Sequence, residues 1–272
     1  MLLKQLKPQF ECYSGYILDL DGVIWIGDKP LPDAIEAVKK LRKIGKKVLF
    51  VTNNSTRSRE DYEKRLRNLG LDAEVGDIIN SGYATAVLLR ERYEGGDVYV
   101  VGEEGLVEEL ENQGFRVVSR EECWERGVDF VVVGMDRGFD YWKIATAMRA
   151  IRRGALYIAT NADKTFPSEK GLLPGAGTMV AAISTASGKD PDIIVGKPNK
   201  HIFEIALKNI GLRKEEVLVV GDRIDTDIEG AHKSKISSLL ILTGVTSKEE
   251  VEKSQIKPDF VLSSLKELFY EA

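Results

Sequence analysis

The sequence predicts an α/β protein built around a mainly parallel sheet. Short apolar runs with the character of buried strands alternate with amphipathic segments over nearly the whole chain. Polar clusters follow directly after several of these runs, and the chain contains no internal repeat. Its 272 residues, 43% of them apolar, are enough for a sizeable core in one or two domains.

Each predicted element follows from the spacing of its apolar residues. The predicted strands are residues 16–20, 48–51, 98–101, 117–118, 130–133, 156–159, 193–195, 217–220 and 239–242. The predicted helices are residues 33–44, 58–68, 103–112, 141–152, 178–187, 200–210 and 226–233. Gly45 follows the first helix as a stop signal, and Ser58 with Asp61 forms an S-x-x-D capping box at the start of the second. Residues 160–177, rich in Pro, Gly and polar residues, form a connection long enough to suggest a functional loop.

Composition excludes several classes of function. A net charge of −4 provides no general basic field for nucleic acid. Cys12 and Cys123 stand far apart, which argues against a zinc site or a disulfide framework and for a reducing compartment. The chain has neither a secretory apolar run nor the roughly 20 apolar residues of a membrane span. We therefore expect a cytoplasmic protein, and we assign Trp25 to packing.

The first polar cluster is Asp19-Leu20-Asp21-Gly22, directly after a predicted strand. Two carboxylates two residues apart in an extended chain point the same way. At the carboxyl end of a parallel strand they would face the crevice where open α/β sheets bind ligands. The competing interpretation is a hairpin, because Asp-Gly between apolar runs is a strong turn signal.

Two further clusters can bind phosphate. Thr52, Asn53 and Asn54 follow the next predicted strand, where hydroxyl, amide and backbone N–H groups can donate to phosphate oxygens. Lys197, held between a glycine and a proline, can neutralise a carboxylate and a phosphate packed together. The ordinary alternatives are a polar loop and a solvated lysine.

The fourth cluster contains Asp222, Asp225 and Asp227 after the strand predicted at residues 217–220. Carboxylate oxygens suit Mg²⁺, which usually takes one or two protein carboxylates together with water and substrate phosphate. A capped helix start with Asp225 or Thr226 as the N-cap is compatible with this interpretation. Four polar clusters at four strand ends, in this order, are more informative than any one of them.

In combination, these clusters resemble the signature motifs of the haloacid dehalogenase superfamily of phosphohydrolases. The stretches TNNSTRS, ATNADKTFPSEKGLLPGAGT, VGKPN and VGDRIDTDIEGA are similar to the branch of p-nitrophenyl phosphatases, NagD-like nucleotidases and phosphoglycolate phosphatases. The resemblance covers essentially the whole chain. It implies a Rossmann-like three-layer core formed by residues 1–81 and 176–272, with an inserted α/β cap at residues 82–175. The cap would carry the substrate-specificity loop, in which Asn161 and Phe166 are expected to contact substrate.

The resemblance also implies a mechanism. Asp19 would attack phosphorus to form an aspartyl-phosphate, and Asp21 would act as acid and then as base. Mg²⁺ would be the cofactor. Its expected ligands are the Asp19 carboxylate, the Asp21 backbone carbonyl and Asp222, with Asp227 orienting the site from behind. The residues expected to hold the phosphate are Thr52, Asn53, Asn54 and Lys197.

Several other functions share part of this pattern. A dehalogenase needs no metal and normally lacks the second aspartate, whereas Asp21 and the acidic fourth cluster are present. A phosphomutase would share the motifs but fits the narrower stretches less well. A non-catalytic binding protein would be expected to lose an acid or the lysine. No G-x-G-x-x-G follows the first strand, so a dinucleotide site is disfavoured. The expected partner is a small phosphorylated substrate, and a homodimer is a further expectation because caps in this branch can pair.

Overall fold

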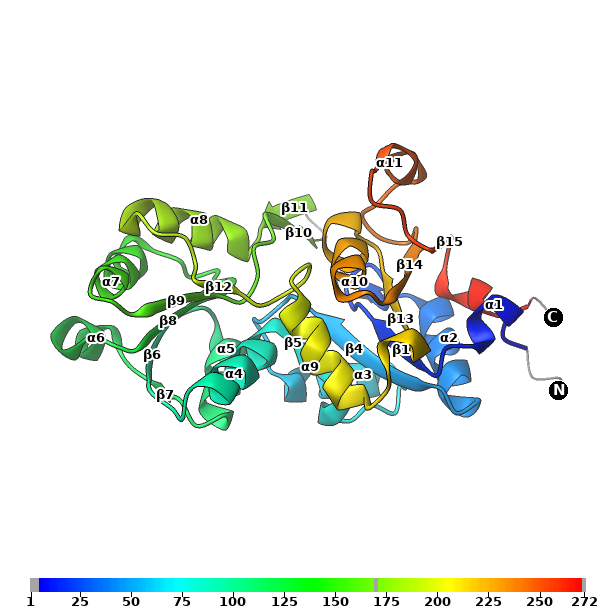
Figure 1. Cartoon of the computed structure of the whole chain (residues 1–272), viewed down its shortest axis with the longest axis horizontal. Coiled ribbons are helices and arrows are strands. Elements are labelled where there is room, and N and C mark those ends of the chain that lie inside the picture. The colour runs from blue at the N-terminus through cyan, green and yellow to red at the C-terminus, as the bar shows by residue number, and fades with distance from the viewer. Residues whose placement is uncertain (1–4, 169–170, 271–272) are drawn as a thin grey trace.

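The computed structural model of the protein describes residues 5–168 and 171–270, which form two parallel sheets with helices on both faces (Figure 1). The expected specificity loop therefore has residues 169–170 outside the described part. Among the described residues, no helix combines the length and the apolar character needed to cross a membrane. The predicted fold class, α/β with mainly parallel sheets, is confirmed.

The larger sheet has six strands in the order β15-β14-β13-β1-β4-β5, and neighbouring strands are parallel throughout. In chain order, these strands are β1 (Gly15–Leu18), β4 (Lys47–Thr52), β5 (Ile78–Asn80), β13 (Val217–Gly221), β14 (Ser237–Ile241) and β15 (Phe260–Leu262). The central strands are apolar along their length because helices cover both faces. Tyr16 and Leu18 of β1 belong to one core cluster, and Ile17 belongs to the cluster on the opposite face.

Two layers of helices flank this sheet, which makes a three-layer unit. On one face lie α2 (Pro32–Lys43) and α3 (Arg59–Asn68), and on the other lie α9 (Lys200–Ile210) and α10 (Glu229–Ser234). Two shorter helices, α1 (Pro8–Glu11) and α11 (Lys248–Lys253), complete this part of the chain. The layering brings the carboxyl ends of β1, β4 and β13 to one edge of the sheet.

The second sheet has five parallel strands in the order β12-β9-β8-β6-β7. In chain order, these strands are β6 (Asp97–Val101), β7 (Arg116–Val117), β8 (Phe130–Val133), β9 (Leu156–Ala159) and β12 (Ile193–Ile194). Its helices are α4 (Ser81–Arg92), α5 (Glu104–Asn112), α6 (Arg120–Arg126), α7 (Tyr141–Arg152) and α8 (Ala176–Ser187). One core cluster continues from the first sheet through α4 and α5 into the second, so the two parts share apolar packing.

The position at which the chain returns to the first sheet differs from the sequence-based expectation of residue 176. Helix α8 packs beside α7, and β12 pairs with β9 in the second sheet. The inserted unit therefore extends to about residue 195 by sheet membership. Apolar patterning could not reveal this, because a buried strand looks the same whichever sheet it joins.

Two small antiparallel ribbons project from the sheets: β2 (Trp25–Ile26) with β3 (Lys29–Pro30), and β10 (Thr165–Ser168) with β11 (Gly171–Pro174). The hairpin interpretation of Asp21-Gly22 is wrong, because β1 pairs in parallel with both β4 and β13. The turn instead carries the chain away from the strand tip, with Gly22 at φ +84°.

Two helix starts differ from the prediction. Ser58 stands at the N-cap of α3 but makes no side-chain capping bond. The first free backbone N–H of the helix, that of Arg59, is instead satisfied by the Glu109 carboxylate at 2.8 Å. The helix predicted at residues 226–233 opens with a π-turn, Ile224–Ile228, before α10 begins.

Candidate active site

A cavity of about 310 Å³ lies where the carboxyl ends of the two sheets meet. Parallel strands place their carboxyl ends at the same edge, so side chains distant in sequence converge there. The predicted site residues that line it are Asp19, Asp21, Thr52, Asn53, Asn54, Asn161, Phe166, Lys197 and Asp222. The tenth, Asp227, is buried and bonds to Lys197.

Lys197 follows β12 and reaches across to the tip of β1. Its Nζ lies 2.7 Å from Asp19 Oδ1 and 2.7 Å from Asp227 Oδ1, and only 4% of its side chain is exposed. Its third donor contact is the Val51 carbonyl oxygen at 3.3 Å. Burial alone would lower the pKa of Lys197, but the two carboxylates outweigh that effect and raise the pKa. The lysine is therefore charged throughout the neutral pH range.

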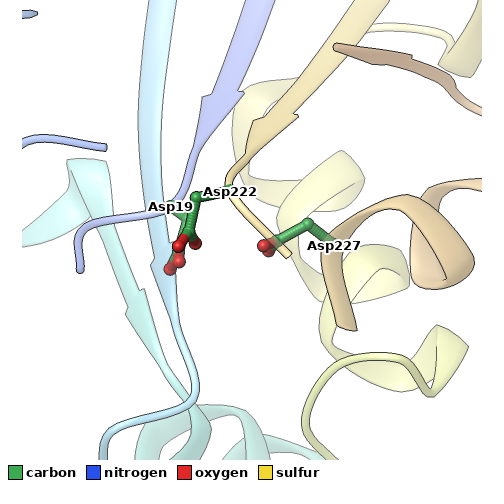
Figure 2. A group of neighbouring side chains, drawn as sticks. All are labelled: Asp19, Asp222 and Asp227. Atoms are coloured by element: carbon green, nitrogen blue, oxygen red, sulfur yellow. The ribbon is translucent and has the colours of Figure 1, made fainter. Parts of the chain in front are cut away.

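Asp19, Asp222 and Asp227 bring carboxylate oxygens within 4.8 Å of one another, and all three are buried (Figure 2). Burial raises the pKa of Asp19 well above its ordinary value, and the nearby charges of Asp227 and Asp222 add to that effect while Lys197 opposes it. Burial, followed by repulsion from Asp227, raises the pKa of Asp222 to about 7. With all three carboxylates ionised, the cluster would carry more negative charge than Lys197 alone balances.

The hydrogen bonds of these carboxylates distinguish their possible roles. Asp222 Oδ2 accepts from the Val245 backbone N–H at 2.7 Å, whereas its buried Oδ1 has no hydrogen-bond partner among the described residues. Both oxygens of Asp227 already accept, Oδ1 from Lys197 and Oδ2 from the Arg223 backbone N–H at 3.1 Å. A buried, unpartnered carboxylate oxygen beside a second carboxylate fits a hard divalent cation held by Asp19 and Asp222.

Asp21 lies on the turn after β1. Its Oδ1 accepts a hydrogen bond from Trp25 Nε1 at 3.0 Å. Burial raises the pKa of Asp21, and the Trp25 bond opposes that rise only in part. Trp25 is therefore more than a packing residue, and the sequence contained no signal for its contact because an indole in a core segment is usually apolar filling.

The Thr52–Ser55 turn is held by its own side chains. The Asn53 side chain brackets the backbone of Lys197, accepting from its N–H at 2.8 Å and donating to its carbonyl at 2.9 Å. Asn54 Oδ1 accepts from the backbone and the hydroxyl of Thr56. Because both polar atoms of the Asn53 amide are engaged, the groups of this turn best suited to a phosphate are the Thr52 hydroxyl, the backbone N–H of Asn53 and Nδ2 of Asn54.

The second sheet and the β10–β11 ribbon contribute further lining residues, of which three bear on the predicted site. Asn161 follows β9, and its side-chain amide donates to the Asn53 carbonyl at 2.7 Å and to Thr160 Oγ1 at 3.2 Å. Asp163, which the sequence interpretation did not single out, accepts from Asn53 Nδ2 at 3.0 Å, and burial raises its pKa. Phe166 lines the cavity from β10. Asn161 and Asp163 therefore hold the Thr52–Ser55 turn from the side of the second sheet.

Comparison with known proteins agrees with this geometry. A family model described as haloacid dehalogenase-like hydrolase matches residues 16–116, and a second, HAD-hydrolase-like model matches residues 194–268. An acid sugar phosphatase of Staphylococcus saprophyticus is 36% identical over 259 residues, covering 95% of this chain and 98% of the relative.

Two solved structures are also similar over nearly the whole chain. The p-nitrophenyl phosphatase of Archaeoglobus fulgidus has a TM-score of 0.87 at 41% identity, covering 93% of this chain and 97% of that chain. A glycerol phosphate phosphatase of Mycobacterium tuberculosis, in complex with magnesium, has a TM-score of 0.88 at 37% identity, covering 98% of this chain and 79% of that chain. The strand-tip carboxylates, the buried lysine and these full-length similarities agree: the chain belongs to the haloacid dehalogenase superfamily of hydrolases, in its phosphatase branch.

Proposed function

We propose that this protein is a Mg²⁺-dependent phosphomonoesterase that acts on a small phosphorylated metabolite through an aspartyl-phosphate on Asp19. The observation that carries this proposal is the strand-tip cluster. Asp19 lies at the wall of the cavity, paired with Lys197 at 2.7 Å and beside the unpartnered oxygen of Asp222. Nothing else in the described cavity combines a carboxylate nucleophile with so much compensating charge.

In the first step, a carboxylate oxygen of Asp19 attacks phosphorus and the bond to the ester oxygen breaks. Asp21 donates a proton to the departing alkoxide. Such an acid must hold its proton near neutral pH, and the raised pKa of Asp21 supports that role. Trp25 fixes the orientation of the carboxyl group through the bond to Oδ1.

In the second step, water attacks phosphorus and Asp21, now ionised, accepts a proton from it. The acyl–phosphate bond breaks, which regenerates the Asp19 carboxylate and releases inorganic phosphate. Lys197 stays charged in both steps and stabilises whichever oxygen of Asp19 or of the phosphoryl group carries negative charge. The Thr52 hydroxyl and the Asn53 N–H are placed to donate to the remaining phosphoryl oxygens.

The residues proposed to hold Mg²⁺ are Asp19, the backbone carbonyl of Asp21, and Asp222. When bound, the ion would relieve the repulsion between the carboxylates and a dianionic phosphate and would stabilise the negative charge that develops in the transition state. Asp227 contributes from behind by orienting Lys197 and the Arg223 backbone. The glycerol phosphate phosphatase of Mycobacterium tuberculosis, solved both with magnesium and with calcium, supports a divalent ion at this type of site.

We further propose that the unit carrying the second sheet acts as the cap, with Phe166 contacting the substrate. The names of the similar proteins, which include sugar phosphate, glycerol phosphate and p-nitrophenyl phosphate activities, support a small substrate without selecting one. Asn161 is better suited to positioning the phosphate turn than to contacting substrate directly, because both polar atoms of its amide are engaged. A cytoplasmic location and pairing of two caps in a homodimer stay predictions.

The deciding experiment measures phosphate release from p-nitrophenyl phosphate with Mg²⁺, with EDTA, and after Mg²⁺ is restored. We expect turnover that EDTA abolishes and Mg²⁺ recovers. Turnover that survives EDTA would contradict the metal assignment, and absence of turnover across sugar, glycerol and nucleoside phosphates would favour a non-catalytic binding protein. Halide release from a haloacid without metal would identify a dehalogenase.

A further inference from the structure

The cavity that contains Asp19 is unusually rich in guanidinium groups. The arginines that line it are Arg57, Arg65, Arg137 and Arg223. The proposed chemistry uses Lys197 and a metal ion for the phosphoryl group and assigns no task to any of these arginines. Whether each guanidinium is free or already paired therefore indicates what the rest of the cavity can bind.

Three of the four have protein partners. Arg137 forms a two-contact ion pair with Glu103, and Arg223 forms one with Asp225 at 2.8 and 3.0 Å. Arg65 donates to a backbone carbonyl oxygen of the β2–β3 turn. Arg57 differs from them, because its exposed guanidinium makes no hydrogen bond or ion pair with any residue in the described part of the chain.

The backbone that carries Arg57 is firmly held. Asn80 Nδ2 donates to the Arg57 carbonyl at 2.9 Å, and Glu109 accepts from the Arg59 N–H at 2.8 Å. Glu109 and Asn80 are fully buried. The helix α5 approaches so closely that a Cβ on Gly105 would overlap the Arg57 backbone. The guanidinium of Arg57 is unpaired, while its backbone is fixed by hydrogen bonds and by close packing. This combination is expected of a preorganised binding group.

Arg57 lines the same cavity as Asp21, the proposed acid. The loop that contains Arg57 begins at Thr52, the residue proposed to hold the phosphate, which lines that cavity as well. Asp21, as the proposed acid, must approach the ester oxygen of the substrate. A cation that follows the phosphate turn, in the cavity that also contains Asp21, is therefore available to the organic part of the ester.

We propose that Arg57 is a specificity-determining residue that binds a second anionic group, a carboxylate or a second phosphate, on the leaving group of the substrate. This inference rests on the proposed phosphomonoesterase function. Arginine presents paired N–H donors that match the oxygens of either group. The preferred substrates are accordingly phosphomonoesters that carry an additional acidic group.

The test compares esters that differ only in that group. Phospholactate is matched with isopropyl phosphate, and ethylene glycol bisphosphate is matched with ethylene glycol monophosphate. For each ester, kcat/KM is measured with wild type and with the variants Arg57→Gln, Arg57→Lys and Arg126→Gln. Arg126 is an exposed arginine on α6, outside the cavity, and controls for general loss of positive charge. Thermal unfolding of each variant verifies the fold.

We expect Arg57→Gln to lower the ratio of kcat/KM for the anionic ester to that for its neutral match by about 10- to 100-fold, mainly through KM. Arg57→Lys should recover part of the ratio, and Arg126→Gln should leave it unchanged. The pair that responds distinguishes a carboxylate from a phosphate.

Three outcomes would overturn the inference. The first is a kcat/KM ratio that does not change in Arg57→Gln. The second is an equal loss of kcat/KM on both esters of a pair, which would place Arg57 on the phosphoryl group itself. The third is the same change of the ratio in Arg126→Gln. Failure of wild type to hydrolyse any of the four esters, or p-nitrophenyl phosphate, would instead contradict the proposed function.

Discussion

The two parallel sheets end at the same cavity but supply different kinds of group. Two central strands of the larger sheet end in charged side chains, with Asp19 after β1 and Asp222 after β13. Two central strands of the second sheet end in small or neutral residues, Gly134 after β8 and Thr160 after β9. Its edge strand β12 provides the exception, because Lys197 follows it.

The difference shows that the same topology can serve chemistry in one sheet and support in the other. Thr160 Oγ1 lies 3.4 Å from Ser55 Oγ, and a Cβ on Gly134 would stand 2.6 Å from that same hydroxyl oxygen. The second sheet thus presses against the back of the phosphate-binding turn. Charged groups at its strand ends would compete with those of the first sheet for Lys197, whereas small groups allow close contact.

The largest expected effect concerns the charged strand tip. Asp19→Ala removes the proposed nucleophile and should reduce phosphate release from p-nitrophenyl phosphate by at least about 10⁴-fold. Asp61→Asn, on the surface of α3, is the matched control and should leave the rate unchanged. Turnover of Asp19→Ala above about one hundredth of wild type, with an intact fold, would remove Asp19 from that role.

A second prediction tests whether the positive charge of Lys197, apart from its packing, is needed at the carboxyl end of β1. Lys197→Met leaves Asp19 and Asp227 buried without their shared cation, so the free energy of unfolding should fall by roughly 3–5 kcal/mol and activity by about 100-fold or more. Urea unfolding and steady-state rates measure both. If Lys197→Met unfolds at the same urea concentration as wild type, burial of the Asp19 and Asp227 carboxylates does not depend on the charge of Lys197.

A third prediction tests the supporting role of the second sheet. Gly134→Ala should push Ser55 and displace the phosphate turn, which would cost roughly 1–3 kcal/mol of stability and raise KM more than it lowers kcat. Gly76→Ala, where the added methyl meets no atom within 4 Å, is the control. If the two variants behave alike, the contact between the second sheet and the turn has no influence on substrate binding.

The smallest expected effect is a pH dependence of stability in EDTA. Asp222 has an ordinary pKa of 3.8 and a folded pKa of about 7, so between these values the folded state holds a proton that the unfolded chain has lost. Raising the pH across this window removes that proton at a cost, and the free energy of unfolding falls by a few kcal/mol at most. Asp222→Asn should lose this slope, and Mg²⁺ should stabilise wild type more at pH 8 than at pH 5. Parallel pH profiles of wild type and Asp222→Asn would contradict the assignment of the shift to Asp222.

The sequence was informative wherever chemistry depends on a residue type after a buried strand. The apolar runs and the polar clusters behind them predicted an α/β fold and a shared site for Asp19, Thr52, Lys197 and Asp222. Less was predictable where the pattern is weak. The short strands β5 and β15 and the helix α4 lack clear periodicity, and α4 in particular is buried on more than one side.

Residue identities and their order along the chain therefore determined the fold class, the nucleophile candidate and the candidate metal-binding carboxylates, because each depends on local pattern and on strand ends. Only the tertiary structure decided which sheet β12 joins, which carboxylate oxygen stays unpartnered, that Trp25 bonds to Asp21, and that one arginine of the cavity is free. These features depend on contacts between segments far apart in the chain, and spacing along a single sequence carries no information about such partners.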